Sequence, residues 1–555
     1  MDKKAKSISR RKALTLTVGA GTAALLTQRA AAQLTTMKTP GVYIVERDAF
    51  PNSVVEVATS IPVFIGYTET ATYADMSLDM KATRVDSLAR YIAMFGKGAA
   101  PTFDLLDAPA ADGRSEKVSL DAGDGTSDYH LTDISTRYAL YDAVRMFYAN
   151  GGSDCYVISV GSYIDAIEVE ALLAGLALVD GADNAALLVV PDAAQLAADD
   201  AATINKAMLE SCGTRQSRFA ILDVANGDKP RVTAEDDPIE AFRAGIGADH
   251  LSYGAAYYPW LETSLYKGSD IKLEDLTSPA RMIVSNSLRR ELITTNNGEL
   301  SQDQIALIGT VAGPQRDPEA PPMPHPAEER VVAPEFEPAA LNSSLRELSD
   351  AFQMITRHAA KLVNLQPPSG AMAGVYARVD NNEGVWKAPA NTGIDDANQP
   401  VIAIDNQAQA DLNAPIDGKA VNAIRSFPGR GLLIWGARTL DGNSTDWRYI
   451  SVRRTMIMIE QSVKAATQAY VFEPNTGNTW TTIKAMISNY LTNIWKEGGL
   501  AGATPSEAFS VQVGLGSTMT AQDNLDGKMR VEVMVAVSRP AEFIVFSFEQ
   551  QMQQS

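Results

Sequence analysis

The sequence predicts an α/β fold, α+β overall, with more than one domain. The chain has 555 residues, more than a single hydrophobic core normally holds. Between residues 135 and 258, short apolar runs alternate with helical patterns, which is typical of a layered domain with a partly parallel sheet. Both ends of the chain also carry short alternating segments that predict strands lying apart from the globular patterns.

The N-terminal half opens with a short predicted strand, PGVYIVE at 40–46, which follows a turn. The segment 105–128 is rich in Asp and Gly and predicts a loop. Ser135 is placed to cap a helix that Gly151 and Gly152 end. The other predicted elements are strands at 61–67, 156–160, 186–190, 219–223 and 253–258, and helices at 88–95, 164–178, 194–209 and 239–246.

The C-terminal half begins after a proline-rich segment. Eight prolines fall between residues 313 and 338, and such a run forms neither helix nor central strand, so it predicts a solvated linker or an extended loop. Beyond it, Asn342 or Ser343 is placed to cap a helix whose apolar stripe runs to Leu362. The remaining predicted elements are helices at 449–471 and 480–496, a strand at 529–537, an interruption at Arg539-Pro540 and a strand at 542–548.

The composition excludes several classes of function. The formal net charge is −19, and no Lys/Arg run contains interleaved aromatic residues, which argues against binding to nucleic acid or anionic lipid. No stretch reaches the ~18–20 apolar residues that a membrane span needs. The two cysteines and four histidines show no metal-ligand spacing, and phosphate-loop and nucleophile-elbow motifs are absent. We therefore predict no catalytic, cofactor or metal site and no direct membrane insertion.

Residues 1–36 form a predicted leader with two interpretations. The segment SRRKAL at 9–14 precedes a weakly apolar run and the small-residue pattern AAAQ at 30–33, as in twin-arginine export signals. A start codon assigned too early, with Met37 as the true first residue, accounts for the same pattern.

The two terminal strands must find backbone partners, because unpaired buried amides are costly. Each strand pairs with the chain's own sheet or adds to the sheet of a neighbouring copy. Pairing with the chain's own sheet is the ordinary case. The breaks at Pro40 and Pro540, which separate the strands from the rest of the chain, give more weight to pairing with a neighbouring copy. The predicted arm residues are Val42, Tyr43, Ile44, Val45 and Glu46 at one end, and Glu542, Phe543, Ile544, Val545, Phe546 and Phe548 at the other.

Two pairs of charged residues also have alternative interpretations. Asp192 and Asp223 follow predicted strands, where ligands gather in α/β sheets, so an exported hydrolase-like enzyme is one alternative; helix capping explains them equally well. Arg453 and Arg454 lie in the first turn of the helix at 449–471, where positive charge opposes the helix dipole. This placement indicates either an external acidic partner or pairing with carboxylates of the chain.

An exported surface-layer or adhesive protein is a third alternative for the function of the protein if the leader is cleaved.

Several segments, taken in order, resemble the contractile tail sheath proteins of phages and phage-derived injection systems. The most specific are PSGAMAGVYARVDNNEGVWKAPAN at 368–391 and AVNAIRSFPGRGLLIWGARTL at 420–440, neither of which contains a plausible nucleophile–base pair. The others, in chain order, are PGVYIVE, IPVFIGYTETA, AVRMFYANGGSDCYVISV, RFAILDV, AAYYPW, and YISVRRTMIMIEQS followed by YVFEPN. Together these segments cover most of residues 40–548.

The resemblance implies a non-enzymatic homo-oligomer in which many copies form a helical sheath around an inner tube, with baseplate and terminal cap proteins as further partners. Contraction of the sheath drives the tube through a target envelope, and the arms join neighbouring copies. Arg453 and Arg454 are the candidate tube contacts. Assembly in the cytoplasm is implied, with export through the leader as the alternative. The implied divisions are the leader (1–36), an N-terminal arm (37–60), a variable outer α/β domain (61–312), the proline-rich linker (313–340), the conserved inner sheath domain (341–538) and a C-terminal arm (539–555).

Overall fold

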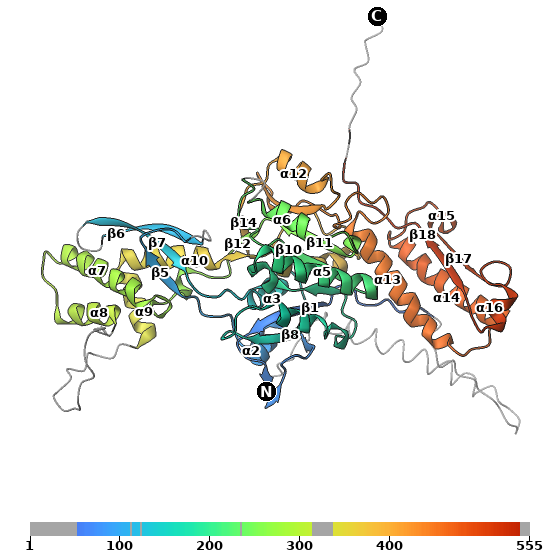
Figure 1. Cartoon of the computed structure of the whole chain (residues 1–555), viewed down its shortest axis with the longest axis horizontal. Helices are drawn as coiled ribbons and strands as arrows, with labels where there is room; N and C mark the ends of the chain where they lie inside the picture. The colour runs from blue at the N-terminus through green and yellow to red at the C-terminus, as the bar shows by residue number, and fades with distance from the viewer. Residues whose placement is uncertain are drawn as a thin grey trace, which may run out of the picture. The chain divides into compact units, whose positions relative to one another are not determined.

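The computed structural model describes residues 53–110, 114–121, 125–232, 236–313, 337–543 and 545 (Figure 1). The predicted leader and the predicted N-terminal arm, Val42 to Glu46, lie outside these residues, as do Ile544, Phe546 and Phe548 of the predicted C-terminal arm. Among the described residues, every helix is too short or too polar to cross a lipid bilayer.

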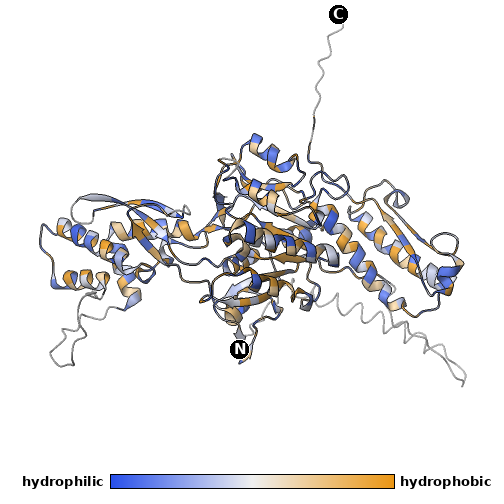
Figure 2. Cartoon of the chain, viewed as in Figure 1, coloured by the Kyte–Doolittle hydropathy of each residue, from blue (hydrophilic) through white to orange (hydrophobic). Residues whose placement is uncertain are grey.

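A central sheet of eight strands confirms the predicted α/β fold. Its order is β16-β15-β11-β10-β9-β1-β8-β4, and the six strands from β15 to β8 run parallel, whereas the two edge strands are antiparallel to their neighbours. The strands are β1 (Pro62–Thr68), β4 (Thr83–Val85), β8 (Cys155–Ser162), β9 (Leu187–Val189), β10 (Phe219–Asp223), β11 (Gly254–Tyr258), β15 (Val421–Phe427) and β16 (Gly431–Ile434). Every residue of β1, β9, β10 and β11 is buried, because both faces of a parallel sheet are covered. Figure 2 shows that hydrophobic residues predominate along these central strands.

Helices cover both faces of this sheet. Ile65 of β1 faces α4 (Val169–Leu176), whereas the next residue, Gly66, faces α3 (Leu140–Ala149), since successive strand residues point to opposite sides. The helix α11 (Ser369–Glu383) packs directly on α3. A Cβ atom at Gly370 would lie 2.4 Å from the carbonyl oxygen of Ala143, so the small residues of PSGAMAG allow the two backbones to approach. The other helices around the sheet are α2 (Leu88–Phe95), α5 (Ala198–Arg215), α6 (Pro238–Gly245) and α12 (Asn406–Asn413).

A second hydrophobic core corrects the predicted domain boundaries. This core joins residues 103–131, 271–311 and 341–362, so it spans the proline-rich segment, whereas the central core contains residues from Val63 to Leu265 and again from Ala371 to Ile457. The predicted outer domain at 61–312 and inner domain at 341–538 therefore do not match the cores. The proline-rich run lies in the sequence between α8 and α9, two helices of the same core, so it does not separate the two cores. The elements of this lobe are β5 (Phe103–Leu106), β6 (Ser115–Asp121), β7 (Thr126–Asp133), α7 (Ser278–Thr295), α8 (Gln302–Ala312), α9 (Pro338–Leu348) and α10 (Asp350–Val363).

Three local predictions, two in the N-terminal half of the chain and one in the C-terminal half, were wrong. The segment 105–128 contains a β-hairpin, in which Val118 and Leu120 of β6 are buried in alternation with polar residues. The helix predicted from Asn342 starts at Pro338 and breaks at Ser349, whose hydroxyl caps α10 by accepting a hydrogen bond from Phe352 N. Ser135 caps no helix, because its hydroxyl donates to Asp133 and the helix begins at Leu140.

A third core forms the C-terminal lobe, which contains α13 (Ile450–Thr467), α14 (Gly477–Lys496) and the hairpin of β17 (Phe509–Val513) with β18 (Val531–Val535). Figure 1 shows these elements in orange and red. The two helices and the strand at 529–537 were predicted within a few residues of these bounds. Alternate residues of β17 and β18, from Phe509↔Val535 to Val513↔Val531, face the helices and cover them with apolar side chains.

Candidate assembly interface

The two candidate catalytic acids each cap a helix. Asp192 is buried, and its Oδ1 accepts hydrogen bonds from Ala139 N (2.5 Å) and Leu140 N (3.1 Å), while Oδ2 accepts one from Tyr67 N (2.7 Å). The carboxylate thus ties the start of α3 to β1, and its burial raises its pKa to about 6 although the three N–H groups oppose the shift. Backbone groups engage both oxygens of Asp192.

Asp223 caps the start of α11, because the residue that precedes this helix supplies no side-chain cap. Its Oδ1 accepts a hydrogen bond from Ser369 N (2.8 Å) and its Oδ2 accepts one from Ser369 Oγ (2.5 Å). Burial raises the pKa of Asp223 to about 7, against the effect of the two bonds to Ser369. The structure therefore supports the capping interpretation of both acids and gives no support to a hydrolase.

Arg454 lies inside the chain, not on a surface for a partner. Its side chain is 3% exposed, and its guanidinium forms an ion pair with Asp380, which is 5% exposed. Arg454 Nη2 also donates to the carbonyl of Thr59 (3.0 Å), and the guanidinium lies over the ring of Tyr376. The burial of Arg454 argues against the predicted contact with an inner tube. The cost of a positive charge near the start of α13 is offset by the carboxylate of Asp380 inside the chain.

Arg453, the neighbouring candidate, is buried, and no carboxylate of the described residues lies within hydrogen-bond reach of its guanidinium. Its guanidinium lies between the rings of Trp447 and Tyr253, at 3.4 and 4.2 Å from their centroids, and Nη2 donates to Ser252 Oγ (2.8 Å). Burial lowers its pKa from the ordinary arginine value. Since both arginines hold the helix-rich lobe to the rest of the chain, neither fits a contact with an inner tube.

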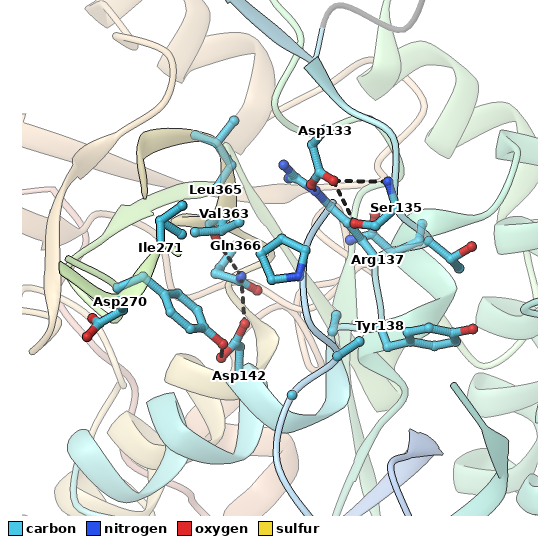
Figure 3. Close-up of a pocket in the computed structure, with 17 residues that line it drawn as sticks. Asp133, Ser135, Arg137, Tyr138, Asp142, Asp270, Ile271, Val363, Leu365 and Gln366 are labelled. Carbon is cyan, nitrogen blue, oxygen red and sulfur yellow. Dashed lines mark hydrogen bonds and ion pairs between the residues drawn. The ribbon is translucent and has the colours of Figure 1, made fainter. Parts of the chain in front are cut away.

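A small hollow of about 120 Å³ lies where the chain passes between the central sheet and the second core (Figure 3). Asp142 braces this joint, accepting hydrogen bonds from Tyr266 OH (2.8 Å) and Gln366 Nε2 (3.0 Å). Figure 3 shows Asp133 bonded to Ser135 beside the same hollow. The residues that line it include no histidine or cysteine, and no described group of three His, Cys, Asp or Glu residues is arranged to hold a metal ion. The hollow therefore lies at a contact between the central sheet and the second core that hydrogen bonds stabilise.

The C-terminal arm is fixed to the body of the chain at Glu542. Its Oε1 accepts hydrogen bonds from Asn413 Nδ2 (2.7 Å) and Arg438 Nε (3.0 Å), and its Oε2 accepts them from Arg438 Nη2 (2.7 Å) and Tyr449 OH (3.1 Å). Burial alone would raise the pKa of Glu542, but these donors outweigh it and hold the pKa below its ordinary value. We call this group the arm anchor.

Beyond the arm anchor the arm turns to solvent. Phe543 is 73% exposed and Val545 is 86% exposed, and the described arm residues form no strand within the chain. A hollow of about 880 Å³ adjoins this point, and its lining includes Trp386, Trp435 and Phe543. Within the described part of the predicted arm, Glu542 is therefore anchored, whereas the side chains of Phe543 and Val545 are mostly exposed.

The hairpin of β17 and β18 has two open edges. The sheet contains only these two strands among the residues that the structure describes, and Met534 on its outer face is 50% exposed. The apolar face of the hairpin packs on the helices of this lobe, and among the described residues neither outer edge of the sheet pairs with a further strand. The hairpin is thus a template for strand addition.

Comparison with known proteins bears on these features. Residues 443–551 match the phage tail sheath C-terminal domain, and residues 331–440 match the phage tail sheath protein central domain. Residues 331–551 of the chain thus carry both domains of contractile tail sheath proteins.

The similar proteins match different shares of this chain. The tail sheath protein of Burkholderia phage BcepMu is 28% identical over 25% of the chain, and that of Vibrio phage KVP40 is 30% identical over 24%. These matches span only 30% and 20% of the relatives' own lengths. The anti-feeding prophage helical sheath, solved in its contracted state, is 27% identical with a TM-score of 0.55, covering 93% of this chain and 100% of that one.

The matched C-terminal sheath domain contains α13, α14, the hairpin of β17 and β18, and Glu542 and Tyr449 of the arm anchor, whereas Asn413 and Arg438 of the arm anchor lie in the matched central domain. Sequence reasoning named Glu542 as an arm residue but missed its partners, Arg438, Asn413 and Tyr449. Arg438 and Tyr449 lie in segments that were quoted for the family resemblance, yet nothing in the sequence pairs them with a residue about a hundred positions away.

Replacing Glu542 tests the arm anchor. In Glu542→Ala, the buried Arg438 guanidinium loses its carboxylate, so we expect the free energy of unfolding to fall by about 2–3 kcal/mol, less than for a fully buried pair because Glu542 is 20% exposed. Glu542→Gln keeps two acceptor positions and should lose less. Because the pKa of Glu542 is lowered by folding, its contribution is present above its ordinary pKa and is lost as the pH falls. Urea unfolding at pH 7 and pH 4 measures this, and equal stability of the Ala variant and the unaltered chain at pH 7 would contradict it.

Proposed function

We propose that this protein is the structural subunit of a contractile sheath, in which many copies polymerise helically around an inner tube and shorten to drive that tube through a target envelope. The observation that carries the proposal is the combination, within one matched sheath domain, of a two-stranded hairpin with open edges and an anchored arm that leaves the chain with exposed apolar residues. The family identity also implies a non-enzymatic role.

Strand exchange between copies supplies the lattice contacts. As an extended strand, the arm beyond Glu542 would place Ile544, Phe546 and Phe548 on one face, so it fits an edge of the hairpin in a neighbouring copy. Each ladder hydrogen bond contributes about 1 kcal/mol net, and each phenylalanine that becomes buried contributes ~1.5–3 kcal/mol. The apolar side chains would therefore provide most of the binding free energy, and the backbone bonds would set the register. The segment 42–46 is the second candidate arm.

The arm anchor gives this exchange a mechanical role. A chain that holds its own arm by four hydrogen bonds and donates the rest of the arm to a neighbour stays linked to that neighbour while the bodies rotate. The energy of contraction then comes from the difference between two packings of the same linked subunits. We propose an inner tube protein, a baseplate and a terminal cap as the other partners, and assembly in the cytoplasm.

Electron microscopy of the purified protein tests the proposal. The full chain should form hollow tubes, whereas a chain ending at Phe543 should stay folded and non-polymeric, because it keeps the arm anchor and lacks the exchanged segment. A chain starting at Met37 is the matched control: it is also shortened at one end but keeps both arms, so it should form tubes. Tubes of normal length from the chain ending at Phe543 would refute the role of the arm, and a full chain that never polymerises would refute the proposed function.

A further inference from the structure

The far end of the C-terminal lobe carries four exposed apolar side chains. Val471 and Phe472 lie in the turn between α13 and α14, and they are 60% and 102% exposed. Leu515 and Leu525 lie in the segment that joins β17 to β18, and they are 49% and 82% exposed. We call these four residues the tip. Soluble chains seldom gather large apolar side chains at one exposed turn without a binding role.

The turn that carries Phe472 is rigidly held. Asn475 Oδ1 accepts a hydrogen bond from Trp480 Nε1 (2.6 Å), and Asn475 Nδ2 donates to the carbonyl of Lys528 (3.2 Å), which brings the two segments of the tip side by side. Thr479 Oγ1 donates to the carbonyl of Pro474 (2.7 Å). These hydrogen bonds hold the turn, and with it the exposed ring of Phe472, in a fixed position.

The backbone of Phe472 is strained. Its φ is +73°, in the left-handed region that bulky residues rarely adopt. Its ring is fully exposed, so no packing within the described chain compensates the strain. Such strain persists where the surrounding structure imposes it, and it is concentrated at functional sites. Neither backbone preference nor burial accounts for a phenylalanine here, whereas an interface does.

A second copy of this chain is the partner that fits the tip. Arg530 pairs with Asp523 (3.0 Å) and Lys528 with Asp526 (3.3 Å), and the exposed Glu473 beside Phe472 is a further acidic charge at the tip. Chains with a net charge of −19 repel one another, and their association depends on uncharged contacts. The tip also adjoins the start of β18, so it continues the hairpin edge at which the arm of another copy is proposed to bind.

We propose that the tip is a second contact between copies, in which Phe472 inserts into a neighbouring subunit beside the shared sheet. This inference rests on the proposed sheath function and deepens it. The strain at Phe472 lowers the stability of the free chain, and contact with the neighbour offsets it by burying the ring.

Phe472→Gly in the full chain separates the two roles of the residue. Glycine adopts a positive φ without strain, so the melting temperature below the polymerisation threshold should stay the same or rise. The protein concentration needed for tube formation, measured by sedimentation, should rise about ten-fold or more because the ring is lost. Phe472→Leu keeps an apolar side chain and should polymerise within a few-fold of the unaltered chain. Met80→Gly, at another bulky residue with positive φ (+53°), is the matched control for strain relief and should leave the threshold unchanged.

Four outcomes would overturn the inference. The first is an unchanged threshold for Phe472→Gly, and the second is a raised threshold accompanied by a lowered melting temperature, which would mean a structural role. The third is normal polymerisation of Phe472→Gly combined with failure to assemble on an inner tube, which would assign the tip to the tube. The fourth is failure of the unaltered chain to polymerise at any concentration, which would also refute the proposed function; the first three leave that function intact.

Discussion

Arg454→Met should destabilise the chain by about 3–5 kcal/mol in its free energy of unfolding. Methionine keeps the length and volume of the side chain but leaves the Asp380 carboxylate, 5% exposed, without its cation. A buried charge that loses its partner costs far more than the net contribution of the pair, since the desolvation penalty remains. Thr59 Oγ1 still donates to Asp380 (2.6 Å), which offsets only part of the loss. Chemical denaturation of the chain ending at Phe543, which lacks the exchanged arm, measures the effect.

Two further variants make this test specific. Arg453→Met lies in the same helical turn and is equally buried, but no carboxylate is left behind, so we expect a loss of only about 1–2 kcal/mol from the missing stacking and hydrogen bond. The double variant Arg454→Met with Asp380→Asn removes both charges and should regain most of the stability. Equal losses for the two arginines would show that the ion pair is not the reason. Variants that unfold normally but fail to bind an inner tube would restore the tube-contact prediction.

Asp223→Asn should remove a pH dependence from the stability of the chain. Burial raises the pKa of Asp223 from 3.8 to about 7, so folding favours the protonated carboxyl. The contribution of this group is therefore fully present below about pH 4, and it is lost as the pH rises through 7. Asparagine is neutral at every pH, and its amide can replace both bonds, because Oδ1 accepts from Ser369 N and Nδ2 donates to Ser369 Oγ.

The expected difference is large. Each pH unit between the two pKa values changes the stability of the unaltered chain by up to ~1.4 kcal/mol relative to the Asn variant, so between pH 5 and pH 7 the difference should reach about 2–3 kcal/mol in favour of Asn. Asp223→Ala serves as the control, since it also does not titrate but leaves the start of α11 uncapped and should be less stable than the Asn variant at both pH values. A stability difference between the unaltered chain and the Asp223→Asn variant that is independent of pH would contradict the raised pKa.

The central sheet could be predicted from the sequence, because its strands are buried on both faces and read as continuous apolar runs. The runs at 61–67, 219–223 and 253–258 became β1, β10 and β11 within a residue or two. The hairpin of β6 and β7 was missed because its strands are short, rich in polar residues and joined by Asp and Gly, so its alternation is weak beside the turn signals. The proline-rich segment was read as a domain boundary because composition reports where the chain is irregular, not which helices pack together.

The sequence by itself indicated the resemblance to contractile tail sheath proteins, through the order of its motifs along the chain, and its apolar periodicities predicted most strands and helices. Only the tertiary structure decided what the charged residues do. Arg454 meets Asp380 across 74 positions, Arg438 meets Glu542 across 104, and Asp223 meets Ser369 across 146. Local sequence patterns report on interactions over a few residues, whereas the burial of a charged side chain depends on partners that lie far away in the sequence and come close only in the folded chain. For this reason Arg453 and Arg454, which suggested an external partner, are buried inside the chain.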